Sequence, residues 1–175
     1  NLALRRKVLT GAGLTTQQWT YDYPVAIGSW LADCNVTACD YTSHTDMVDP
    51  AGNATRYTFS NRADVTEGKP LRTDYYVGSV FANPIRYDTY TYADPSQGPW
   101  PARIGWSFDV NGNQDRAQKE APLLIQQIHV DSDTYTWQAL AFDIFARPTD
   151  VRRYSSIGYG VEESASYQDD FARWV

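Results

Sequence analysis

The stretch from Trp100 to Arg147 decides the predicted fold, and it reads WPARIGWSFDVNGNQDRAQKEAPLLIQQIHVDSDTYTWQALAFDIFAR. Apolar, aromatic and β-branched residues gather in three runs: Arg103–Val110, Leu123–Val130 and Tyr135–Phe145. Segments rich in Asn, Gly, Asp and Ser separate these runs, which is the pattern of sequential β-strands. We therefore expect three consecutive strands in this part of the chain.

The rest of the sequence continues the same alternation of short extended runs and polar turns. Further strands are predicted at 17–24, 56–59, 71–81, 86–92 and 150–159, and a turn is predicted at Asp46–Asn53. Leu2–Leu9 could be a short helix or an added strand, and a helical spacing of apolar residues is seen only at the end, at Tyr167, Phe171, Trp174 and Val175. No internal repeat is evident.

Many short strands with almost no helix predict an all-β fold, and more specifically a β-sandwich or jelly roll with at most one short C-terminal helix. The length of 175 residues favours one domain. We expect this domain to span residues 11–175, preceded by an N-terminal arm at residues 1–10.

Charge and hydropathy exclude some classes of partner. The formal net charge is −6, so nucleic acid, which requires a basic field, is not an expected partner. An acidic polysaccharide remains compatible with this charge, because a local basic cleft is enough to bind one. No run of about 18 apolar residues is present, so no membrane span is predicted.

The two cysteines favour a location outside the cytoplasm. Cys34 and Cys39 are close in the sequence and no other cysteine is present, so a local disulfide is a better interpretation than a zinc site. Glycosylation sequons begin at Asn35 and Asn53. Together these features predict a secreted, extracellular protein.

The first candidate functional residues lie in the run at 123–130. Side chains alternate along a strand, so Gln127 and His129 are predicted to share a face with Leu123 and Ile125. An imidazole beside an amide on an apolar strand suggests a binding or catalytic site. A core histidine with one hydrogen-bonded partner explains the same residues equally well.

Gln127-Ile128-His129, preceded by a strand with Arg72-Thr73-Asp74 and one with Trp106-Ser107-Phe108, resembles the jelly-roll polysaccharide lyases of the alginate, glucuronan and heparin lyase types. The resemblance covers roughly residues 56–145. The chain departs from the family where Asp74-Tyr75 replaces the usual Glu-Leu, and where Tyr154–Tyr159 lacks the lysine of the late Tyr-x-Lys-x-Gly-x-Tyr strand.

The resemblance implies β-elimination on a uronate-containing polymer, with Arg72, Gln127, His129 and Tyr159 as the catalytic set. An arginine and an amide would neutralise the substrate carboxylate, and a histidine or tyrosine would transfer protons. Simpler interpretations stay open: an ion pair between Arg72 and Asp74 on a solvated strand, and ordinary packing for Tyr159.

A calcium site is the one cofactor interpretation that the sequence suggests. Oxygen-bearing side chains recur at alternate positions, Asp109, Asn111, Asn113 and Asp115, with Glu120 further on. The glycine is misplaced for a calcium loop of the EF-hand type, so an Asn-Gly turn between strands is favoured. No other cofactor is expected.

A structural protein without catalysis is the alternative class. An acidic, tyrosine-rich β-domain with a short basic arm suits a subunit of a coat, fibre or extracellular filament, in which Leu2–Leu9 pairs with the open sheet edge of a neighbour. A sugar-binding module without catalysis is a further alternative. The position of Arg72, Gln127 and His129 on one concave face would favour a lyase or lectin, and their burial would favour the structural class.

Overall fold

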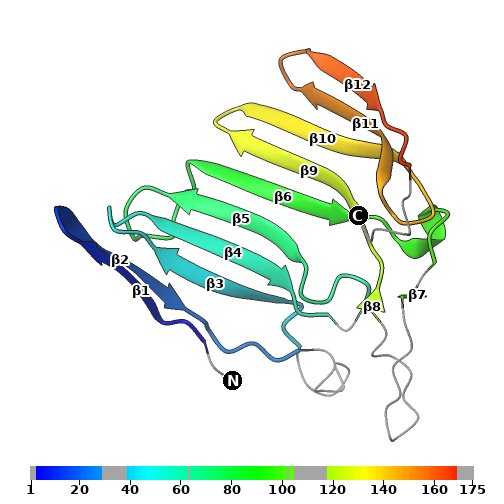
Figure 1. The fold of residues 1–175 in the computed structure, drawn as a ribbon. Coiled ribbons are helices and arrows are strands. Elements are labelled where there is room, and N and C mark those ends of the chain that lie inside the picture. Colours follow the sequence, from blue (N-terminus) through cyan, green and yellow to red (C-terminus); the bar gives the residue numbers. More distant parts are fainter. Residues whose placement is uncertain (1–2, 29–38, 63, 102, 105–117, 169–175) are drawn as a thin grey trace, which may run out of the picture. The chain divides into compact units, whose positions relative to one another are not determined.

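The computed structural model describes residues 3–28, 39–62, 64–101, 103–104 and 118–168. Ten strands form one antiparallel sheet in the order β1-β2-β3-β4-β5-β6-β9-β10-β11-β12, and β7 and β8 form a separate two-stranded sheet (Figure 1). The predicted all-β class is therefore confirmed. The described residues contain no helix long and apolar enough to cross a membrane.

The strands have the following bounds: β1 Arg6–Gly11, β2 Leu14–Asp22, β3 Thr42–Val48, β4 Ala54–Ser60, β5 Pro70–Tyr76, β6 Arg86–Tyr92, β7 Arg103–Ile104, β8 Gln118–Lys119, β9 Leu123–Val130, β10 Asp133–Phe142, β11 Pro148–Ser155 and β12 Gly160–Ser164. A 3-10 turn, η1, spans Pro95–Gln97. The bounds of β6 and β9 agree with the prediction. The C-terminal helix was predicted mainly from residues outside the described part of the chain.

Two sequence-based expectations change. The turn predicted at Asp46–Asn53 begins only at Asp49, because Asp46, Met47 and Val48 belong to β3. Leu2–Leu9, for which helix and strand were both open, becomes strand from Arg6 onward. The polar sequence of β3, Thr-Ser-His-Thr-Asp-Met-Val, carries little strand signal of its own, and pairing with β4 over its whole length holds it extended.

The chain divides into two compact units. The first comprises residues 1–90 and 127–134, and the second comprises residues 91–126 and 135–175. The second unit has an apolar cluster of Ala93, Trp100 and Ala146, against which Leu124 and Phe142 pack. The Trp100 and Phe142 rings meet edge to face with centroids 5.0 Å apart. The predicted single domain at 11–175 stays a prediction.

The first unit is held together in a different way. Apart from Gly28, Ala54 and Tyr76, its buried described residues are polar: Thr55, Ser60, Thr73, Asp74 and Asp88. Arginine side chains lie over aromatic rings on both faces of the sheet, for example Arg86 over Tyr75 and Arg56 over Phe81. Such contacts contribute roughly 0.5–1 kcal/mol each at exposed sites and more when desolvated. Ion pairs and cation–π contacts thus lie on both faces of the sheet in this unit.

One kind of hairpin turn recurs three times, although no repeat was predicted. In the turns Asp49–Asn53, Asp143–Arg147 and Ser155–Tyr159, the first N–H donates to the carbonyl of the fifth residue, and the fourth N–H donates to the carbonyl of the first. The fourth residue has a positive φ in each turn: 85° at Gly52, 61° at Ala146 and 96° at Gly158. Sequence identity is low between the turns, so the repeat is visible only in the backbone.

The β1–β2 hairpin is the most exposed element of the first unit. All residues of β1 are exposed, and β2 pairs with β3 only at Thr20, Tyr21 and Asp22. The remainder of the hairpin extends past β3 as a two-stranded ribbon that carries exposed Val8, Leu9 and Leu14.

Candidate functional site

One face of the first unit carries a row of charged and aromatic side chains across four strands. Strand register places Asp46 opposite Arg56, Arg56 opposite Asp74 and Asp74 opposite Tyr87, so these four residues form a row across β3, β4, β5 and β6. We name the Arg–His face as the set of His44, Asp46, Arg56, Arg72, Asp74, Tyr87 and His129. All belong to the first unit.

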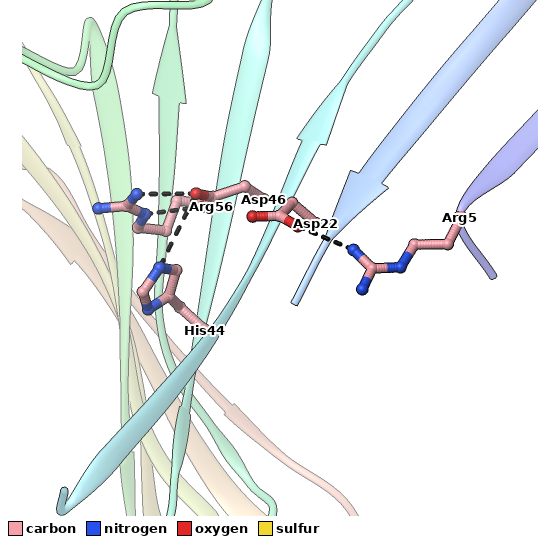
Figure 2. Close-up of polar contacts among 5 residues, drawn as sticks. All are labelled: Arg5, Asp22, His44, Asp46 and Arg56. Atoms are coloured by element: carbon pink, nitrogen blue, oxygen red, sulfur yellow. Dashed lines mark hydrogen bonds and ion pairs between the residues drawn. The ribbon is translucent and has the colours of Figure 1, made fainter. Parts of the chain in front are cut away.

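The Asp46 end of the Arg–His face is a three-residue cluster (Figure 2). Arg56 Nε and Nη2 donate to the two Asp46 carboxylate oxygens at 2.7 and 2.8 Å. His44 Nε2 lies 3.8 Å from Asp46 Oδ2. Both charges of this pair are therefore satisfied within the sheet, and the bidentate geometry fixes the arginine.

The other end is a stack of three flat side chains. The Arg72 guanidinium lies 4.0 Å from the centre of the Tyr87 ring, and the His129 ring stacks on Tyr87 with centroids 4.3 Å apart and planes inclined by 15°. Two planar groups cannot share one side of a ring at these distances, so Arg72 and His129 cover opposite sides of Tyr87. His129 Nδ1 lies 3.1 Å from Thr134 Oγ1, which fixes the imidazole.

Arg72 is held by a buried carboxylate. Its Nε and Nη2 lie 2.8 and 2.6 Å from Asp74 Oδ1. The Asp74 side chain is 8% exposed, and that of Arg72 is 42% exposed. The guanidinium thus keeps one side toward solvent while the sheet neutralises its charge.

Electrostatics reinforce these pairs. The hydrogen bond from Arg56 to Asp46 raises the pKa of Arg56, and the bond from Arg72 to Asp74 raises the pKa of Arg72, which in each case outweighs the effect of burial. Burial, together with the nearby Asp74 carboxylate, raises the pKa of Tyr76. Both arginines and the neutral tyrosine therefore keep their protons at neutral pH.

The structure brings together part of the sequence-predicted catalytic set. Arg72 and His129 both contact Tyr87, and Gln127 lies two residues before His129 on β9, where the strand period places it on the same face. Tyr159 belongs to the second unit, in the turn before β12, and is 80% exposed. Its role with the other three stays a prediction.

Other predicted site residues lie outside the described part of the chain. These are the proposed calcium ligands Asp109, Asn111, Asn113 and Asp115. Among the described residues no group of three or more His, Cys, Asp or Glu side chains is arranged to hold a metal ion. Cys34 also lies outside, so its disulfide with Cys39 stays a prediction.

Sequence reasoning missed Tyr87 and the His44–Asp46–Arg56 cluster. Tyr87 links Arg72 to His129, but these residues come from β5, β6 and β9, and no sequence spacing shows that the three strands are neighbours. The alternation of His44 with Asp46 along β3 is an available signal, but the turn predicted at Asp46–Asn53 hides it.

No family model matches the chain, and the searches of curated proteins and of solved structures found no similar protein.

Proposed function

We propose that the protein is a structural subunit without catalytic activity that assembles through the edges of its β-sheet. The observation that carries this proposal is the β1–β2 hairpin, which exposes Val8, Leu9 and Leu14 on a ribbon that only three residues of β2 tie to β3. An isolated two-stranded hairpin is marginally stable in water, and an exposed edge strand is a template for another strand. A partner would stabilise both features.

The Arg–His face supports the same proposal. Its arginines are paired with carboxylates of the same face, and both sides of the Tyr87 ring are covered by side chains of the same face. A surface that satisfies its own charges and rings stabilises a sheet and leaves few groups for a ligand. The sandwich or jelly-roll arrangement expected from the sequence is part of this proposal.

Assembly can be tested with the purified chain. Sedimentation velocity should show species larger than the monomer that grow with protein concentration. A variant that lacks residues 1–18 should keep the β-type circular dichroism spectrum and remain monomeric. A wild-type chain that stays monomeric at every concentration, or a truncated chain that assembles equally well, would contradict the proposal.

We further propose an extracellular location, in agreement with the predicted disulfide between Cys34 and Cys39. Closing so short a loop would stabilise the fold by about 2 kcal/mol. Thiol titration of the unfolded, unreduced protein should find no free thiol. Two titratable thiols per chain would remove the disulfide from the proposal.

Polyuronate cleavage is the second candidate function, favoured by the partly exposed grouping of Arg72, Gln127 and His129 on one face of β5 and β9. In the tautomer in which His129 Nδ1–H donates to Thr134 Oγ1, Nε2 is the ring nitrogen that accepts a substrate proton. A substrate carboxylate would share Arg72 with Asp74.

The lyase candidate predicts unsaturated products that absorb in the ultraviolet when the protein is incubated with alginate, glucuronan or a heparin-like polymer. His129→Ala should abolish this absorbance, and His44→Ala, which changes the other histidine of the Arg–His face, should retain it. Equal activity in both variants, or none in the wild type, would reject the lyase candidate.

A further inference from the structure

We propose that the partner of β1 is β12 of a second copy of this chain, so that subunits join head to tail into a continuous sheet. This inference rests on the proposed structural function and names its interface. Within the described chain, β1 and β12 are the two edge strands of the ten-stranded sheet (Figure 1). Every residue of both strands is exposed.

The two edges carry opposite charge. Arg5, Arg6 and Lys7 precede or begin β1, whereas Glu162 and Glu163 occupy the centre of β12. Two copies of the β1 edge would repel each other, and so would two copies of β12. Charge therefore selects the pairing of unlike edges, which is a head-to-tail contact that leaves a free edge at each end.

Backbone geometry restricts the register of this contact. Tyr21 N–H donates to the Arg5 carbonyl, so Arg5 faces β2, and the alternation of an antiparallel ladder turns the backbone groups of Arg6 and Val8 outward. Ala165 N–H donates to the Thr149 carbonyl, so by the same alternation the backbone groups of Glu162 and Gly160 point away from β11.

Outward-facing residues must pair with outward-facing residues. The antiparallel register that places Arg6 opposite Glu162 meets this condition, and it also places Arg5 opposite Glu163. Two opposite-charge pairs form in one register, one on each face of the sheet. Registers displaced by two residues also satisfy the backbone but form fewer charged pairs, which makes the Arg6–Glu162 register the favoured one.

Neighbouring charges extend the pattern. Arg5 is bound to Asp22 at 2.8 Å within its own chain, and Glu162 and Glu163 are paired with Arg152 and Arg153 of their own chain. Across the contact, Asp22, Arg5, Glu163 and Arg153 would then alternate in sign. Networks of this kind contribute more than isolated surface pairs.

Charge reversal tests the contact. Arg5→Glu/Arg6→Glu should weaken self-association by about tenfold or more, because two attractive pairs become repulsive, and Glu162→Arg/Glu163→Arg should do the same. An equimolar mixture of the two variants should assemble again, because each acidic β1 meets a basic β12. The matched controls are Arg62→Glu and Glu67→Arg in the exposed β4–β5 loop, which should not change association.

A disulfide tests the register separately. Lys7 lies opposite Val161 in the favoured register, so a Lys7→Cys chain mixed with a Val161→Cys chain should form a cross-linked dimer under mild oxidation. A Lys7→Cys chain mixed with a Glu162→Cys chain should form less of it. Circular dichroism of each variant verifies folding.

The outcomes separate this inference from the function it rests on. A wild-type chain that never assembles rejects both. A wild-type chain that assembles, with charge-reversed variants that assemble equally well and fail to restore each other in mixtures, rejects the β1–β12 contact and leaves the structural function standing.

Discussion

Asp74 is the residue on which the Arg–His face depends most. Its side chain is nearly buried, and Arg72 provides the hydrogen bonds that compensate its charge. An exposed ion pair such as Arg5–Asp22, with side chains 65% and 69% exposed, has solvent as an alternative partner. The two ion pairs have similar distances. Removing the arginine would leave a buried carboxylate at Asp74 but a solvent-exposed one at Asp22.

Arg72→Ala should therefore lower the free energy of unfolding by about 2 kcal/mol, because a carboxylate is left buried without its partner. Arg5→Ala, the matched control, should lower it by less than about 1 kcal/mol. Urea unfolding of the two variants and the wild type provides the comparison. Equal losses in both variants would show that Asp74 does not depend on Arg72.

At the scale of elements, the repeated hairpin turn shows how different sequences reach one backbone. Asp49 Oδ1 accepts hydrogen bonds from the N–H groups of Ala51 and Asn53, and Asp143 Oδ1 accepts them from Phe145 and Arg147. The third turn begins with Ser155 and has the same backbone bonds. An aspartate at the first position thus adds two hydrogen bonds to a turn that a serine also supports.

The φ of 96° at Gly158 gives a prediction for the third turn. Gly158→Ala should lower the free energy of unfolding by roughly 1–2 kcal/mol, since a Cβ is strained in the left-handed region. Gly160→Ala is the matched control two residues later, where an added Cβ would meet Tyr154 Cβ at an ordinary 3.6 Å. Thermal melts should give a lower melting temperature for Gly158→Ala than for Gly160→Ala. Equal melting temperatures would contradict the left-handed conformation at Gly158.

The elements also show what sequence could predict. The bounds of β6 and β9 follow from their alternating or apolar residues, Arg-Tyr-Asp-Thr-Tyr-Thr-Tyr and Leu-Leu-Ile-Gln-Gln-Ile-His-Val. β3 was missed because its polar residues lack an apolar alternation and its last three residues fall in the stretch predicted as a turn, whereas pairing with β4 holds it extended. The Arg72–Tyr87–His129 stack was out of reach because it needs the order of strands, which local patterns do not contain.

At the scale of the molecule, charge is used in two ways. Inside the first unit, Asp46, Arg56, Asp74 and Arg72 compensate one another on one face. At the edges, β1 is basic and β12 is acidic, although the whole chain has a net charge of −6. The excess of negative charge keeps chains apart in general, so association depends on a local match of unlike edges.

Stability should also fall at low pH, because two carboxyl groups have a lowered pKa in the folded chain. Burial alone would raise the pKa of Asp143, but hydrogen bonds from Arg147 and Phe145 lower it. Burial would likewise raise the pKa of Asp64, but hydrogen bonds from Thr66 and the nearby charge of Arg62 lower it. A carboxyl whose pKa is lowered in the folded state stabilises it above its unfolded pKa of about 4. That stability is lost as the pH falls through the lowered values.

The alkaline limit of stability follows, with the opposite sign, from two half-buried tyrosines, Tyr57 and Tyr75. Burial raises the pKa of Tyr57 and Tyr75, so their contribution is complete below the unfolded pKa of about 10 and is lost as the pH rises through the raised values. Urea unfolding between pH 2.5 and pH 11 should show a decline at both ends. The stability difference between wild type and Asp143→Asn should shrink below about pH 4, and that between wild type and Tyr75→Phe should change only above about pH 10. Differences that stay constant across the whole range would mean that neither group titrates differently in the folded and unfolded chain.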